Sequence, residues 1–299
     1  MKKGAHFYMY IDRYGKTRYK INLHTHTTLT DGRATPAEVV KRYRSMGYDA
    51  IALTDHWFFG AEDETPDFTV LSGAEYNING NDCRDGVYHI LCIGAKAAPA
   101  VKKAMPPQKI IDEIHRVGGL VVLAHPAWSL NEPEAIAKLR GIDAIEIYNS
   151  VSGVQMSRRP DSSLIVDMLG ARGIFYPLLA ADDAHYYDGS DDCVSWIMVE
   201  ADDCSRERLL PAIREGKFYA TQGPEIHLFR EGDTFVVKCS PVSEIVFLSN
   251  ATWTPRAFKG ENLTEARYKP ADYECFIRAE VMDRDGKRAW SNIIPIPNR

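Results

Sequence analysis

The sequence predicts an α/β fold: a β/α barrel over residues 1–223, followed by a small all-β domain over residues 224–299. Two observations support the barrel. Short apolar runs alternate with helical stretches between about Tyr19 and Thr221, and polar residues able to bind metals repeatedly close the apolar runs. Barrel enzymes carry their active sites at the carboxyl ends of the strands. After Gly223-Pro224 the helix signals stop, which indicates a second, all-β unit.

The strands of the expected barrel are short and mostly apolar. Several are continuous apolar runs, which is typical of strands that are covered on both faces. We expect them at Lys20–His24, Ala50–Thr54, Val70–Glu75, His89–Gly94, Leu120–Ala124, Ala144–Tyr148, Phe175–Ala180 and Ser195–Glu200.

Between these strands lie helices with recognisable ends. Thr35-Pro36-Ala37-Glu38 is a capping box with proline at the first helical position, and it leads into a helix that Gly47 ends. Glycine also follows the other expected helices closely. These are Pro107–Val117, Glu132–Leu139, Ser162–Leu169 and Ser205–Arg214.

The tail has the pattern of a small Ig-like β-sandwich, and Tyr219–Pro224 marks its boundary with the barrel. Turns are expected at Glu231-Gly232-Asp233 and at Asp285-Gly286. We interpret the tail as a packing or oligomerisation domain. Its expected strands are Glu225–Phe229, Phe235–Cys239, Glu244–Leu248, Tyr273–Val281 and Ala289–Pro295.

Composition excludes several classes of protein. The net charge of −5 and the pI of about 6.0 argue against a surface that tracks long nucleic acid, which needs clustered lysine and arginine. No apolar run approaches the roughly 20 residues of a membrane span. The first residues contain no apolar stretch of a secretion signal, so we expect a cytoplasmic protein. The six cysteines form no Cys-x-x-Cys pair and are expected to be reduced, packing residues.

Histidines and carboxylates cluster at the expected strand ends. Two histidines at positions i and i+2 of a strand point to the same side, so both rings can reach one ion. His89 differs from the rest because it begins a strand. The clusters are His24-Thr25-His26, Asp31 in the following loop, Thr54-Asp55-His56, Gly73-Ala74-Glu75, His125-Pro126 and Asp183-Ala184-His185.

Each cluster alone has an ordinary explanation, because a single histidine at a strand end is more often packed and hydrogen-bonded than a ligand. Together, however, six histidines and three carboxylates are expected at one barrel mouth, where such groups are costly to bury without partners. Divalent cations would supply those partners. Nitrogen and oxygen ligands without thiolates suit Zn, Mn or Fe, and nine ligands fit two or three ions.

These motifs resemble the PHP (polymerase and histidinol phosphatase) superfamily. The resemblance covers roughly residues 19–223 and keeps the order of the motifs. The tail, with Trp290-Ser291-Asn292 after Asp285-Gly286, looks like the branch that contains carbaryl-hydrolase-like metallohydrolases. The resemblance implies a distorted (β/α)7 barrel with a trinuclear metal centre.

The resemblance also implies a division of the ligands among three ions. His24, His26, Glu75 and Asp183 would hold one ion, and Asp31, His56 and His185 would hold a second. Glu75, as a bridging ligand, would hold a third ion with His89 and His125. Glu75, Asp183 and His56 are the residues that we expect at the catalytic centre.

The predicted reaction is hydrolysis. Two neighbouring ions can share a water, lower its pKa and stabilise the oxygens of a displacement at phosphorus. We therefore expect a phosphoesterase that cleaves a small phosphomonoester or phosphodiester with a metal-bridging hydroxide. Arg33, Arg158 and Arg159 are candidate phosphate-binding residues at the barrel mouth, since arginine forks fit phosphate oxygens. The alternative for these arginines is a solvated charge on a loop.

Two other functions remain open at this stage. The carbaryl-hydrolase-like tail suggests an alternative substrate, a carboxylic ester or a carbamate, which the same metal centre would cleave. The second alternative is a non-catalytic binding module that the metals stabilise. The intact set of nine ligands speaks against this second alternative, because a site relieved of catalysis has no need to keep all of them.

Overall fold

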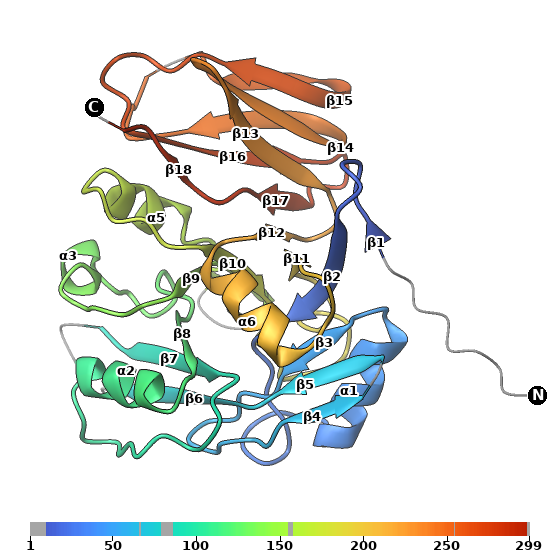
Figure 1. Ribbon diagram of the computed structural model, residues 1–299, viewed down its shortest axis with the longest axis vertical. Helices are drawn as coiled ribbons and strands as arrows, with labels where there is room; N and C mark the ends of the chain where they lie inside the picture. Colours follow the sequence, from blue (N-terminus) through green and yellow to red (C-terminus); the bar gives the residue numbers. More distant parts are fainter. Residues whose placement is uncertain (1–9, 66, 79–85, 155–157, 254, 298–299) are drawn as a thin grey trace, which may run out of the picture.

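The computed structural model describes the chain except for residues 1–9, 66, 79–85, 155–157, 254 and 298–299, so His6 and Cys83 lie outside the described residues. The fold is mixed α/β, as predicted, with many strands and few helices (Figure 1). No helix of the described part is long and apolar enough to cross a membrane.

The strands form two sheets. The larger, 13-stranded sheet has the order β13 (Ile226–Glu231), β14 (Thr234–Leu248), β16 (Phe276–Met282), β17 (Arg288–Trp290), β12 (Phe218–Thr221), β11 (Trp196–Glu200), β2 (Thr17–Asn22), β3 (Ala50–Ala52), β5 (Phe68–Leu71) and β4 (Asp63–Thr65). Off this path, β1 (Tyr10–Ile11) pairs with β2, β15 (Ala257–Tyr268) with β14, and β18 (Ile294–Pro295) with β16. The 5-stranded sheet has the order β10 (Leu178–Ala181), β9 (Ala144–Asn149), β8 (Leu120–Leu123), β7 (Tyr88–Ile93) and β6 (Gly73–Ile78).

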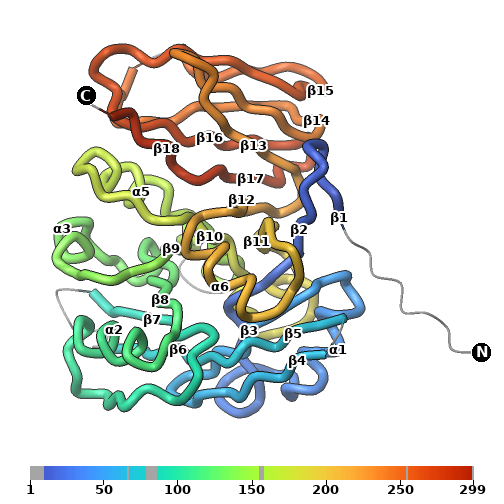
Figure 2. Tube along the Cα trace, viewed as in Figure 1, coloured from blue at the N-terminus to red at the C-terminus, as the bar shows by residue number. Residues whose placement is uncertain are grey.

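Isolated bridges join the sheets. Thr25 pairs with Ala184 just after β2 and β10, and His56 pairs with Glu75 between the end of β3 and β6. Gly73 permits the second junction, since a Cβ atom there would lie 2.6 Å from the carbonyl oxygen of Leu53. The bridges join segments that are far apart in the sequence, from the blue to the yellow part of the chain trace (Figure 2).

Strand direction explains the unusual place of His89. β7 runs antiparallel to both β6 and β8, whereas β8, β9 and β10 are parallel. The beginning of β7 therefore lies at the same edge as the end of β8, and the amide of Ala124 donates to the carbonyl of His89. A residue that starts a strand thus reaches the same centre as residues that end strands.

The helices lie between the strands of the first 223 residues. They are α1 (Pro36–Ser45), α2 (Pro107–Arg116), α3 (Pro133–Ile136), α4 (Val151–Val154), α5 (Ser163–Gly170) and α6 (Arg206–Arg214). The capping box of α1 is confirmed, with Thr35 and Glu38 exchanging hydrogen bonds. α2 buries Ile110, Ile111 and Ile114, and it packs on β7 and β8. The predicted helix Glu132–Leu139 is shorter in the structure.

Several predicted strands differ from the observed ones. The segment Val70–Glu75 is not one strand, because the chain passes from the larger sheet to the smaller one at Ser72, whose hydroxyl donates to the carbonyl of Ala95. In the tail, two predicted strands are one 15-residue strand, β14. Its pairing with β15 shifts between Lys238 and Val242, the stretch that contains Pro241. Proline has no N–H for the ladder, so it is tolerated at such an irregularity.

The tail strands lie together at one end of the molecule (Figure 1), and the larger sheet continues into them. β12, which falls on the predicted boundary, pairs with both β11 and β17. Trp290 is fully buried and stacks on Tyr148 with ring centroids 5.1 Å apart. Arg278, also fully buried, pairs with Asp167 of α5. The division of the chain at residue 224 stays a prediction.

Candidate metal centre

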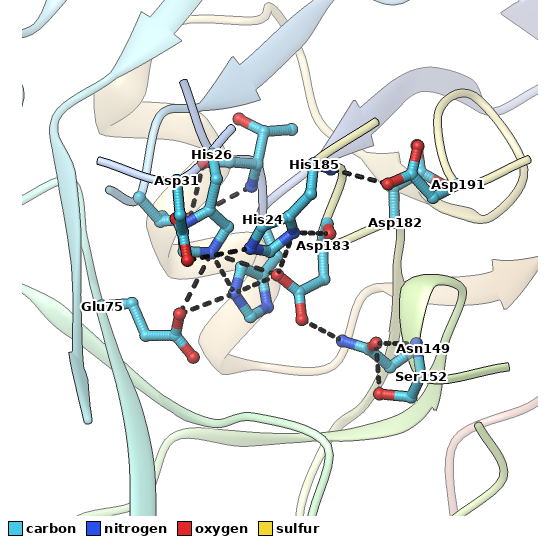
Figure 3. Close-up of polar contacts among 12 residues, drawn as sticks. His24, His26, Asp31, Glu75, Asn149, Ser152, Asp182, Asp183, His185 and Asp191 are labelled. Carbon is cyan, nitrogen blue, oxygen red and sulfur yellow. Dashed lines mark hydrogen bonds and ion pairs between the residues drawn. The ribbon is translucent and has the colours of Figure 1, made fainter. Parts of the chain in front are cut away.

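His24 and His26 follow β2 directly and have no solvent exposure. Their Nε2 atoms lie 3.2 Å apart, as expected for side chains two residues apart on an extended segment (Figure 3). The backbone continues this extension by pairing, since the amide of His26 donates to the carbonyl of Ala184. Both rings therefore present a nitrogen to one point.

Two carboxylates meet the histidines at that point (Figure 3). Glu75 Oε2 lies 3.0 Å from Nε2 of His26 and 3.3 Å from Nε2 of His24. Asp183 Oδ1 lies 3.1 Å from each of the same two nitrogens. One ligand atom from each of these four residues falls within 4.8 Å of the others, which is a spacing that one ion could satisfy.

A second group lies around Asp31. Its carboxylate is 3.4 Å from Nδ1 of His26 and 3.5 Å from the Nε2 atoms of His56 and His185. The side chain of Asp31 is 51% exposed, in contrast to the buried first group. This group therefore forms the side of the centre that solvent and small molecules can reach.

Glu75 also connects a third group. Its Oε1 atom lies 2.6 Å from Nδ1 of His89 and 3.4 Å from Nε2 of His125, and its Oε2 atom lies 3.2 Å from Nδ1 of His56. All nine side chains that the sequence singled out as ligands are thus brought into one cluster. His115 and His227 lie outside it, as expected, against Asp143 and Glu225.

Histidines and carboxylates in the cluster stabilise each other's charged forms. Burial lowers the pKa of His24, but the carboxylates of Asp183, Glu75 and Glu146 outweigh burial and raise the pKa to about 10. Burial raises the pKa of Glu75, but positive charge on His89 and His24 brings that pKa well below its usual range. Ionised carboxylates at this depth require cations beside them.

Unpartnered atoms test whether ions fit the cluster. Nδ1 of His26, Nδ1 of His56 and Oδ1 of Asp183 are buried, and none of them has a hydrogen-bond partner. Buried polar atoms are rarely left in this condition. Three imidazole and carboxylate atoms that lack partners, within a set of nitrogen and oxygen donors, fit divalent ions.

A family comparison identifies part of the chain. Residues 21–98 match the model of the PHP domain. This segment is PHP-like. The matched segment contains His24, His26, Asp31, His56, Glu75 and His89. The other three residues of the cluster lie beyond it in the sequence.

The proteins and structures that are similar to this chain are distant from it in sequence. An uncharacterized protein of Methanocaldococcus jannaschii is 29% identical over 106 residues, which are 36% of this chain and 45% of that protein. The chain thus matches less than half of that relative. A two-domain structure from Bacteroides vulgatus, containing a predicted PHP-like metal-dependent phosphoesterase, is similar over 94% of this chain and 95% of that one, with a TM-score of 0.53 and 15% identity. At this identity the likeness shows the fold alone. The lesion-specific endonuclease Q of Pyrococcus furiosus is similar over 67% of this chain and 56% of its own, at 16% identity and a TM-score of 0.45, which is too slight to bear on function.

Several residues that support the cluster were not singled out from the sequence. The fully buried Glu146 contacts His24 and, through its other oxygen, the amides of His125 and Asn149. A charged residue inside the apolar run Ala-Ile-Glu-Ile-Tyr was the signal that could have revealed it.

Two more aspartates hold the loop that follows β10. Asp182 accepts hydrogen bonds from the amides of Cys193, Val194 and Ser195, and burial raises its pKa to about 7. Asp191 accepts hydrogen bonds from three successive amides that begin at His185. These carboxylates shape the backbone around the ligands rather than pointing into the cluster.

Asp55 holds the loop that carries Asp31. Its carboxylate accepts hydrogen bonds from the amide and hydroxyl of Thr27 and from the hydroxyl of Thr30. The loop also passes close to the strand end, since a Cβ atom at Gly32 would lie 2.4 Å from the carbonyl oxygen of His26. Only glycine fits there.

The three candidate arginines lie differently with respect to the cluster. Arg33 is exposed, its amide donates to the carbonyl of His185, and its guanidinium lies 4.5 Å from the ring centre of Tyr186. It therefore borders the Asp31 side of the centre. Arg158 and Arg159 are exposed on the segment after α4, and no described contact joins their side chains to the cluster.

Proposed function

We propose that this protein is a metal-dependent phosphoesterase that hydrolyses a small phosphomonoester or phosphodiester. The observation that carries the proposal is the convergence of nine imidazole and carboxylate side chains around Glu75, from segments up to 161 positions apart in the sequence. A purely structural cluster of this kind would bury ionised groups with atoms left unpartnered.

The proposed ligand sets are those that the resemblance implies, and in the cluster His26 also lies with the second set and His56 with the third. His24, His26, Glu75 and Asp183 would hold one ion, and Asp31, His56 and His185 a second. Glu75 would also serve a third ion with His89 and His125. Zinc, manganese or iron bound there would supply Lewis acidity and a water of lowered pKa.

The protein itself would orient the substrate. The fully buried His24 and His26 leave no path from their side, so an ester must approach past the half-exposed Asp31. Arg33 borders that approach, and its guanidinium would pair with phosphate oxygens in a forked arrangement. Arg158 and Arg159 are proposed to bind more distant parts of the substrate. Glu75, Asp183 and His56 are proposed as the residues closest to the reacting atoms.

The experiment that tests this proposal is a substrate panel with metal-replete protein. Phosphomonoesters are assayed for phosphate release, aryl phosphodiesters are assayed for release of the aryl alcohol, and aryl carboxylic esters and carbamates are assayed in parallel. The Glu75→Ala variant, prepared in the same way, controls for contaminating phosphatases. Hydrolysis of either kind of phosphate ester by the wild type alone supports the proposal. Hydrolysis of carboxylic esters alone would move the assignment to the carbonyl substrate, and metal binding without any hydrolysis would favour a binding module.

We further propose that β2, β3, β6, β7, β8, β9 and β10 form the distorted seven-stranded barrel, and that residues 224–299 form a β-sandwich domain. The bridges Thr25–Ala184 and His56–Glu75 support the closure of the barrel. Limited proteolysis tests the division: early cleavage near residue 224 that yields a stable fragment of 1–223 supports it, and cleavage only at other sites contradicts it.

A further inference from the structure

Glu146 is a carboxylate that the proposed ligand sets do not use. It lies within β9, has no solvent exposure, and meets three hydrogen-bond donors. Its Oε1 atom is 2.8 Å from Nδ1 of His24, and its Oε2 atom is 2.9 Å from the amide nitrogen of His125 and 2.8 Å from Nδ2 of Asn149. Each of these partners belongs to the cluster or adjoins it.

The contact with His24 decides which ring nitrogen is free. An ionised carboxylate accepts hydrogen bonds but cannot donate one. Nδ1 of His24 therefore carries the proton in this contact. The free lone pair of a neutral His24 is then on Nε2. That atom faces Glu75 Oε2 at 3.3 Å and Asp183 Oδ1 at 3.1 Å.

Asn149 extends the arrangement to a second ligand. Its Oδ1 atom accepts hydrogen bonds from the amide and the hydroxyl of Ser152, which sets the orientation of the side-chain amide (Figure 3). The Nδ2 atom must then face the carboxylates. It lies 2.8 Å from Glu146 Oε2 and 3.2 Å from Asp183 Oδ2.

We propose that Glu146 is a positioning residue for the metal centre: it holds His24 in the tautomer that presents Nε2 to an ion, and through Asn149 it orients Asp183. The inference rests on the proposed metal centre but not on the identity of the substrate. Carboxylate partners of metal-binding histidines raise the basicity of the ring and fix its orientation.

Replacing Glu146 with glutamine keeps the size of the side chain but removes its charge, so it tests the effect on the tautomer of His24 separately from the effect of shape. Three donors converge on the two oxygens of Glu146, and glutamine has the same size but only one acceptor atom. If the glutamine oxygen serves His125 and Asn149, its NH2 group faces Nδ1 of His24 and favours the tautomer with the proton on Nε2. If the oxygen serves His24, the NH2 group opposes two donors. Either arrangement weakens the proposed site.

The experiment is a titration of metal-free Glu146→Gln and wild type with Zn²⁺ and Co²⁺ against a chelator of known affinity. We expect about a 10- to 100-fold loss of affinity for at least one ion, the usual effect of losing such a partner. We also expect an altered visible absorption spectrum of the Co²⁺ protein. Glu146→Asp keeps two acceptor oxygens and should recover part of the affinity.

Glu274→Gln is the matched control. Glu274 is equally buried, but it lies among the tail strands, where its carboxylate accepts hydrogen bonds from Ser249, Tyr268 and Ala271. It should leave metal affinity and the Co²⁺ spectrum unchanged. If Glu146→Gln does not fold, Asn149→Ala replaces it, with an expected loss of several-fold.

The outcomes separate this inference from the proposed function. Wild-type affinity and an unchanged Co²⁺ spectrum in Glu146→Gln, or in Asn149→Ala where that variant is used, overturn the positioning role and leave the phosphoesterase proposal standing. Loss of affinity in a protein that cleaves no phosphate ester supports the positioning role while the proposed function fails. A wild type that binds neither metal overturns both.

Discussion

Nε2 of His26 lies 3.0 Å from Oε2 of Glu75, although His26 follows β2 of the larger sheet and Glu75 lies in β6 of the smaller one. The junction between those sheets, the bridge from His56 to Glu75, brings the carboxylate to this place. Glu75 also contacts His24, His89 and His125, so it links the proposed ion sites to one another. Ion binding at the proposed centre should therefore depend most on this residue.

Replacing Glu75 or His24 with alanine should reduce hydrolysis to background and remove at least one ion per chain. Both side chains are fully buried among other proposed ligands, so their loss cannot be compensated from solvent. Elemental analysis together with a phosphate-release assay measures the effect, and circular dichroism checks that the secondary structure is retained.

The control variants for this prediction are His115→Ala and His227→Ala. His115 contacts the carbonyl of Gly141, and His227 contacts Glu225, both away from the cluster. Metal content and activity should stay at the wild-type level. If all four variants lost metal and activity alike, the assignment of the centre would be wrong.

Arg33→Ala should raise KM for a phosphate ester while metal content stays unchanged. The guanidinium of Arg33 borders the open side of the centre and makes no described contact with a proposed ligand. A lost charge-assisted hydrogen bond is worth about 1.5–3 kcal/mol, or roughly 10- to 100-fold in kcat/KM. Arg116→Ala, at the end of α2, is the control. Equal kinetics in both variants would assign Arg33 to the solvated surface.

Removing the ions should destabilise the protein. Ions that bind the folded state alone add about 2.7 kcal/mol at 100 times their dissociation constant. We therefore expect a chelator to lower Tm by several degrees, and added Zn²⁺ or Mn²⁺ to restore it, in thermal melts followed by circular dichroism. The Glu75→Ala variant should show a smaller chelator effect. A Tm that changes with neither the chelator nor the added metal contradicts the proposed centre.

Arg278→Met should destabilise the protein by about 3 kcal/mol, because it leaves the carboxylates of Asp167 and Glu280 without their buried partner. Chemical denaturation measures the change. Arg267→Met, at an exposed ion pair in the same part of the chain, should change stability far less. Similar values for the two variants would show that Arg278 does not join the tail to α5.

Glu225 gives a prediction for pH. Burial raises its pKa, but hydrogen bonds from His227 and Tyr10 outweigh burial and lower the pKa to about 2. A lowered carboxyl pKa contributes stability that is complete above the unfolded value near 4.5 and is lost as the pH falls through about 2. Glu225→Gln should therefore be less stable than the wild type at pH 5, with a difference that shrinks toward pH 2. Urea denaturation across this range tests it, and a constant difference contradicts it.

Much of the site could be predicted from the sequence because its ligands sit at strand ends. Apolar runs locate the strands, and a histidine or carboxylate at the end of such a run is conspicuous, as at His125 and Asp183. Glu146 is conspicuous as a charged residue inside an apolar run, but its role could not be predicted, because only the fold brings His24 beside it. A contact across 122 positions leaves no local pattern.

The fold could be predicted where periodicity is strong and not where sheets exchange strands. The helix α1 follows from its capping box at Thr35. β15 was not expected because most of its residues are exposed at the edge of the sheet, so no apolar alternation marks it. The switch at Ser72 and the irregularity near Pro241 depend on partners far away in the chain. Local sequence does not record such partners.

The number of divalent ions bound per folded chain tests the central claim most directly. Elemental analysis of protein isolated without chelators should find about two or three equivalents of zinc, manganese or iron in the wild type, and fewer in Glu75→Ala. A folded wild type without divalent metal, even after incubation with each of these ions, would contradict the claim that the nine side chains form a metal centre.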